Sequence, residues 1–193
     1  MSRKMLMFAA AALIPGPAFA HIGVGSTASF AVGVAHPLSG LDHMTVMIAV
    51  GLWAALKGGR SLWVWPVAFV TVMLVGGVLG MTRVPVPFVE PGILASVVAL
   101  GLMVALAIDL PIWLGAVVIA GFALLHGHAH GSEATETVSG AEYMAGFALS
   151  TAALHIVGIG FALGLSRANM RAAVRVAGVL CVLIGTGLAA DVL

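Results

Sequence analysis

Six long apolar stretches, separated by short polar or proline-containing segments, dominate this sequence. They cover residues 22–56, 62–82, 91–108, 111–126, 141–166 and 174–190. A membrane-spanning helix needs about 20 predominantly apolar residues. A helix is favoured because it satisfies its own backbone polar groups, which hydrocarbon cannot do. The pattern therefore predicts an all-α polytopic membrane protein with six transmembrane helices.

Composition supports this class and excludes others. Hydrophobic residues make up 62% of the chain and charged residues only 8%, whereas about a quarter of a soluble domain is charged. The net charge of +1 comes from eight basic and seven acidic residues without a basic stripe, which excludes nucleic-acid binding. Cys181 is the single cysteine, so any metal would be bound by nitrogen and oxygen rather than by a thiolate cluster.

The N-terminus has the pattern of a secretory leader. Two basic residues precede an apolar run at 5–14, and small residues at 18–20 form a cleavage signature. We therefore expect residues 1–20 to be a cleavable signal peptide and residues 21–193 to be a single transmembrane permease domain. An uncleaved first helix is the alternative, but the apolar run is shorter than the ~20 residues that a span needs.

Basic residues set the expected orientation, because short cytoplasmic loops carry most of the Lys and Arg. If the first stretch crosses once from a periplasmic N-terminus, only Arg83 lies outside. The residues that then lie inside are Lys57, Arg60, Arg167, Arg171 and Arg175. Two crossings in that stretch would invert all later loops. We therefore expect one broken first span in the bacterial inner membrane, with the mature N-terminus periplasmic.

The expected break lies at the sequence His-Pro-Leu-Ser-Gly-Leu-Asp-His, residues 36–43. The proline disrupts a helix, and Ser39 and Gly40 can serve as N-cap and loosened backbone for the helix that follows. Ionisable residues within apolar spans are candidates for function. His36, Asp42 and His43 offer two nitrogen donors and one oxygen donor, which suit Ni, Co, Zn or Cu. In the alternative interpretation, Asp42 only satisfies the N-terminus of its helix.

A second group of candidates lies in the expected outer segment 126–140. His126, His128 and His130 alternate, and Glu133 follows. On a helix, His126 and His130 would share a face and His128 would point away. This spacing suits metal chelation, although a histidine-rich loop that binds metal loosely remains an alternative.

Three further residues are candidate metal ligands. Glu90 lies between two prolines at the outer end of the third stretch, where it would stand at the mouth of a pathway or in a solvated loop. His155 lies in the middle of the fifth stretch and is either a ligand or a hydrogen-bonded core residue. Cleavage after residue 20 would leave His21 at the N-terminus, where its amine and imidazole could chelate an ion.

Two of these motifs resemble the signatures of a known family. The segment from His36 to Ala54, with its His-Pro-x-x-Gly-x-Asp-His start, and the His-Gly-x-Ala-His-Gly-x-Glu segment at 126–133 are similar to the HupE/UreJ family. These are bacterial membrane proteins associated with hydrogenase and urease gene clusters and regarded as nickel, sometimes cobalt, permeases. The resemblance covers essentially the whole chain.

The resemblance implies a transition-metal permease that moves Ni(II), or Co(II), into the cytoplasm for hydrogenase or urease maturation. It implies no enzymatic activity and no prosthetic group, because the metal is the transported ion. His128 occupies the variable position of the second motif, so the resemblance does not assign it to the metal pathway. The residues implied as the metal pathway are His36, Asp42, His43, His126, His130 and Glu133.

Two other functions remain open at the level of sequence. A non-transporting metal donor or assembly subunit would bind the same ion, and an intramembrane metalloenzyme would use these ligands around an activated water. The sequence lacks the HExxH motif of zinc metalloproteases. It also lacks a GxxxxGK[ST] motif, which excludes a self-powered ATPase. The predicted partners are a divalent metal ion and the lipid bilayer, with a second copy of the chain and maturation proteins as further candidates.

Overall fold

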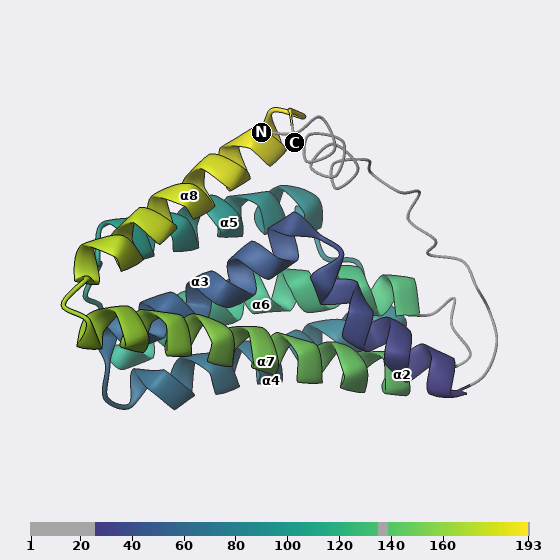
Figure 1. Cartoon of the computed structure of the whole chain (residues 1–193). Helices are drawn as coiled ribbons and strands as arrows, with labels where there is room; N and C mark the ends of the chain where they lie inside the picture. Colours follow the sequence, from purple (N-terminus) through teal and green to yellow (C-terminus); the bar gives the residue numbers. More distant parts are fainter. Residues whose placement is uncertain (1–25, 135–138, 193) are drawn as a thin grey trace, which may run out of the picture.

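The computed structural model describes residues 26–134 and 139–192, and this part of the chain is helical without any strand. Figure 1 shows the helices running back and forth along one bundle. The predicted signal peptide and His21 lie outside the described residues. The helices are α2 (Ser26–Ala35), the 3-10 helix η1 (His36–Leu38), α3 (Leu41–Lys57), α4 (Ser61–Met81), α5 (Val89–Ala105), α6 (Ile112–Ala134), α7 (Gly140–Arg167) and α8 (Arg171–Ala189).

Four of the described helices, α4, α6, α7 and α8, are long and apolar enough to cross a membrane. Helix α5 is apolar but shorter, with 17 residues. The α2–η1 segment and α3 pass the same test only as a pair, and they meet at an angle of 77°. The all-helical class predicted from the sequence is therefore confirmed, while the number of spans depends on how α5 and the bent pair are counted.

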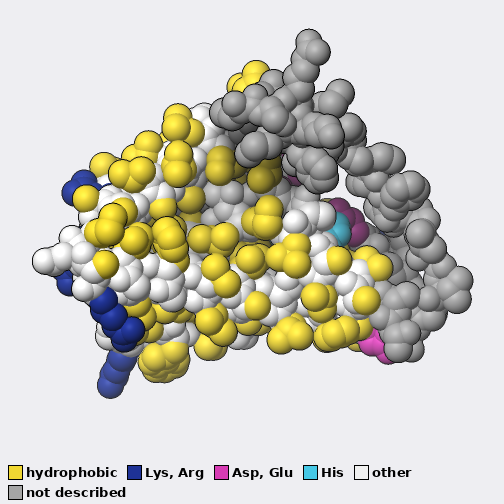
Figure 2. All heavy atoms as spheres, viewed as in Figure 1, with side chains coloured by type: hydrophobic (Ala, Val, Ile, Leu, Met, Phe, Trp, Pro, Cys, Tyr) yellow, Lys and Arg dark blue, Asp and Glu magenta, His cyan; other side chains and the backbone are white. Residues whose placement is uncertain are grey.

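The surface of the bundle is apolar between its ends. Large side chains such as Trp113 and Ile156 are each 68% exposed, and Figure 2 shows hydrophobic side chains over most of the visible face. Lys and Arg side chains gather at one end of this face, and His and acidic side chains are visible toward the other. Such a surface is that of a bundle surrounded by lipid rather than by water.

Helices α4 and α6 approach each other closely through glycine. A Cβ atom at Gly127 would lie 1.9 Å from the carbonyl oxygen of Met73, and one at Gly76 would lie 2.2 Å from that of Leu124. Small residues let transmembrane helices make such contacts. This packing continues to Gly131, so α6 extends to Ala134. The expectation of a polar break starting at residue 126 is wrong, because the histidine-rich segment forms the last turns of α6.

Two buried tryptophans fill the core at the end of the bundle opposite the histidine-rich turns of α6. Trp53 of α3 and Trp65 of α4 are both fully buried, with ring centroids 4.3 Å apart. Their indole N–H groups donate to two carbonyl oxygens, that of Ile108 (2.8 Å) in the loop between α5 and α6 and that of Ile112 (2.9 Å), the first residue of α6. We call this the tryptophan end, and the end that contains His36, His43 and His130 the histidine end.

Candidate metal site

The break between α2 and α3 puts the first motif at the histidine end. Pro37 lies in η1, and the Ser39 hydroxyl donates to the carbonyl oxygen of His36 (2.7 Å). Ser39 therefore does not cap α3. The N-cap is Gly40, whose backbone is extended and makes no side-chain capping bond. Asp42 lies in the first turn of α3, as the sequence predicts.

Asp42 holds the ring of His43. One carboxylate oxygen, Oδ1, accepts hydrogen bonds from the His43 backbone N–H (2.8 Å) and from His43 Nδ1 (2.7 Å). A Cβ atom at Gly40 would lie 2.7 Å from that oxygen, so the glycine leaves room for the Asp42 carboxylate in the position where it binds His43. A carboxylate on one imidazole nitrogen fixes the tautomer and leaves the other nitrogen free to bind metal.

His130 is the centre of the site. Its Nδ1 lies 3.1 Å from Glu133 Oε2, and its Nε2 lies 2.5 Å from His43 Nε2. His36 joins from the other side, with its Nε2 3.4 Å from the same oxygen of Glu133. Ligand atoms of His36, His130 and Glu133 all lie within 4.8 Å of one another, which is close enough to bind one metal ion.

The arrangement of protons in this pair of rings calls for a positive charge. With both carboxylates ionised, Asp42 accepts a hydrogen bond from the Nδ1–H of His43, and Glu133 accepts one from the Nδ1–H of His130. The two Nε2 atoms then present lone pairs to each other at 2.5 Å, because a neutral imidazole has only one N–H. A proton shared between these nitrogens removes the repulsion. A metal ion does the same once the rings move apart, because metal–imidazole bonds of about 2.0–2.1 Å do not fit between nitrogens this close. The four side chains are thus arranged to accept a proton or a metal ion.

His126 is fully buried one turn before His130. The Ser96 hydroxyl donates to the carbonyl oxygen of Ile93 (2.6 Å), so its oxygen accepts from His126 Nε2 (2.9 Å). His126 Nδ1 is buried and has no hydrogen-bond partner among the described residues. Its ring centroid lies 4.9 Å from that of His43. His126 therefore presents an unused lone pair beside the site.

Aromatic residues that the sequence analysis did not single out form one wall of the site. The Phe147 ring stacks on His130 at 4.3 Å, and the Tyr143 ring lies 5.9 Å from His36. Both come from α7 at a spacing of one helical turn. Phe69 of α4 lies 5.9 Å from His126. These rings cover the imidazoles on this side of the site. Phe147 and Tyr143 share one face of α7, but such a face is common in an apolar helix and does not by itself indicate a role.

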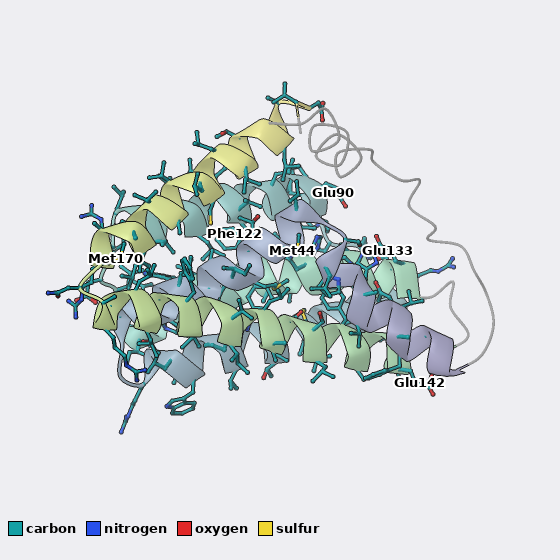
Figure 3. All side chains as sticks on the ribbon, in the orientation of Figure 1. Met44, Glu90, Phe122, Glu133, Glu142 and Met170 are labelled. Carbon is teal, nitrogen blue, oxygen red and sulfur yellow. The ribbon has the colours of Figure 1, made fainter. Side chains whose placement is uncertain are left out.

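Three of the remaining candidates lie apart from this cluster. The His128 Nε2 lies 2.8 Å from the carbonyl oxygen of Val84 and donates to it, so this ring faces the loop after α4. Glu90 is exposed on α5; Figure 3 shows it at the same end as Glu133 but on a different helix. No ion pair or hydrogen bond within residues 26–134 and 139–192 joins Glu90 to the site. His155 is buried deeper along α7.

Comparison with known proteins agrees with both motifs. The family model described as HupE / UreJ protein matches residues 9–188. Protein HupE of Rhizobium leguminosarum bv. viciae is 43% identical over 159 residues, which cover 82% of this chain and 83% of that protein. No solved structure matches. With a match over most of its length and this degree of identity, the chain belongs to the HupE/UreJ family.

Proposed function

We propose that this protein is a permease that carries Ni(II), or Co(II), across the bacterial inner membrane into the cytoplasm for hydrogenase or urease maturation. The observation that carries the proposal is the pair of facing Nε2 atoms of His43 and His130, each backed by a carboxylate on its Nδ1. Imidazole nitrogens with carboxylate oxygen suit Ni(II) and Co(II). Family membership supports the same function.

In this proposal the chain crosses the membrane six times after a cleaved signal peptide. The bent pair of α2 and α3 counts as the first span and α5 as another. The gathering of Lys and Arg at the tryptophan end supports a cytoplasmic position for that end. The histidine end then faces the periplasm, so that the ion first meets the partly exposed His36 and Glu133.

The site favours transport over tight storage. Glu133 is 55% exposed and His36 is 32% exposed, so water reaches one side of the site and ligands can exchange. Conduction needs binding strong enough for entry and weak enough for release. A metalloenzyme would need an activated water held in a closed site, and a metal donor would bind the ion without moving it.

The test is Ni(II) flux into proteoliposomes that contain the purified full-length protein, with and without a proton gradient. We compare wild type with Asp42→Asn, which keeps the shape but frees the His43 ring. Loss of an outer partner costs about 10–100-fold in metal affinity, and we expect flux to fall accordingly. His128→Ala is the matched control and keeps its flux, because this ring bonds to a loop carbonyl oxygen.

Each function predicts a different result. Flux that requires Asp42 but not His128 supports the permease. Ni(II) binding without flux in wild type would assign the protein as a metal donor or assembly subunit. Normal flux in a folded Asp42→Asn protein would overturn the role of the Asp42–His43 pair.

A further inference from the structure

His155 is an unusual residue for the core of an apolar bundle. Its side chain is 1% exposed, and neither ring nitrogen has a hydrogen-bond partner within the described part of the chain. A neutral imidazole carries one donor and one acceptor, so both are left unpaired. Buried polar groups are nearly always paired, and an exception needs an explanation. An apolar side chain of similar size would pack here without this cost.

A row of rings leads from the histidine end to His155. The centroids of His43 and His126 are 4.9 Å apart, and Phe69 lies 5.9 Å from His126 on one side and 5.1 Å from His155 on the other. His126 Nδ1, at the start of this row, also lacks a partner among the described residues. Phe69 thus separates two buried imidazoles that both have unused nitrogens.

Other neutral donors lie next to His155 along the same two helices. Thr151 is one turn before His155 on α7, and Met73 is one turn after Phe69 on α4. Both are fully buried, and the Thr151 hydroxyl donates to Met73 Sδ at 3.7 Å. Of these groups, imidazole is the one that suits Ni(II), because thioether sulfur prefers softer ions such as Cu(I). A site without carboxylates would hold the ion more weakly than the histidine end does.

We propose that His155 is an inner ligand of the translocation path, which takes the divalent ion after it passes His126 and Phe69. This inference rests on the proposed permease function and extends it to the middle of the bundle. His155 lies about half-way along α7, between the histidine end and the buried tryptophans. A second, weaker binding site at that depth shortens the distance over which the ion has no ligand.

The test compares His155→Leu with His155→Gln in the full-length protein. Leucine removes the unpaired polar groups, so thermal stability stays equal or rises. Glutamine keeps an oxygen ligand but remains a buried polar group, so its protein is the less stable of the two. A ligand role predicts the opposite order for Ni(II) flux. His155→Leu loses most of its flux, because one site of a multi-site path is gone, and His155→Gln retains more.

Isothermal titration with Ni(II) is measured on the same samples, and binding at the histidine end stays at the wild-type level in both variants. Ser150→Ala, a buried polar position on the same helix, is the control and keeps its flux. Wild-type flux in His155→Leu would overturn the proposal that His155 is a ligand, and so would a flux that rises and falls with the stability of the variants. Either result would leave the proposed permease function intact. Absence of flux in wild type would overturn both proposals.

Discussion

The two ends of the bundle use aromatic rings in opposite ways. At the tryptophan end, Trp53 and Trp65 are fully buried, and each indole N–H is satisfied by a backbone carbonyl oxygen. At the histidine end, the facing nitrogens of His43 and His130 cannot both be satisfied while the two rings are neutral and the two carboxylates are ionised. The indole groups at the tryptophan end are paired as they stand, whereas the ring nitrogens at the histidine end need a bound cation, either a proton or a metal ion. In the proposed permease, the ion would enter at the histidine end, and the tryptophan end would have to open for it to leave.

Replacement of the central ring is the strongest test of this comparison. His130→Ala removes the side chain that contacts both His43 and Glu133, so we expect Ni(II) affinity to fall beyond the roughly 100-fold that loss of an outer partner can cost. Titration calorimetry on purified protein measures this. His128→Ala, two residues away on the same helix, should bind as wild type does. Equal losses in the two variants would contradict the assigned roles.

Helix packing at the histidine end gives the next prediction. A Cβ atom in Gly131→Ala would lie 2.1 Å from the carbonyl oxygen of Gly77, so α6 must move, at a cost of about 1–3 kcal/mol as in overpacked cores. We expect a lower melting temperature and weaker Ni(II) binding. Gly160→Ala is the control, because no described atom lies within 4 Å of its added Cβ. A Gly131→Ala protein as stable as this control would contradict the close contact.

At the tryptophan end, stability and metal binding should separate. Trp53→Phe keeps an aromatic ring but leaves the half-buried Ile108 carbonyl oxygen without its indole donor, and such a hydrogen bond contributes about 0.5–1.5 kcal/mol. We expect a lower unfolding temperature in detergent together with wild-type Ni(II) affinity. A change in affinity comparable to that of His130→Ala would show that the two ends are not distinct.

The smallest effect is expected at the Lys57–Asp109 ion pair, which links the end of α3 to the loop after α5. Asp109 is 75% exposed, and exposed ion pairs contribute about 0.2–1 kcal/mol. Lys57→Ala should therefore lower the free energy of unfolding only slightly and leave Ni(II) binding unchanged. A loss of several kcal/mol, measured by denaturant unfolding, would mean that this ion pair is needed for the packing of the tryptophan end.

Much of the site follows from local pattern. The i, i+4 spacing of His126 and His130 predicts a shared helix face, and the proline after His36 predicts the break that turns this ring toward α6. Sequence could not show that Asp42 binds the His43 ring, since this depends on the extended backbone at Gly40. The wall formed by Phe147 and Tyr143 was missed because apolar rings in an apolar chain carry no distinguishing signal.

The error in the histidine-rich segment has a clear physical cause. Its glycines and polar residues are typical of a loop when only local propensity is considered. In the bundle, Gly127 and Gly131 lie against the backbone of α4, and the close contact stabilises helix to the end of α6. Tertiary packing therefore outweighs propensity here. The separation of Glu90 from the cluster likewise depends on how α5 packs, which no local pattern contains.

X-ray absorption at the nickel edge of Ni(II)-loaded wild type and His130→Ala tests the central claim most directly. We predict that the wild-type ion is bound by imidazole nitrogen and carboxylate oxygen without sulfur, and that imidazole scattering is lost in His130→Ala. The matched His128→Ala spectrum should equal that of wild type. A nickel spectrum that is unchanged in His130→Ala, or one dominated by water, would contradict the assignment of the histidine end as the metal site.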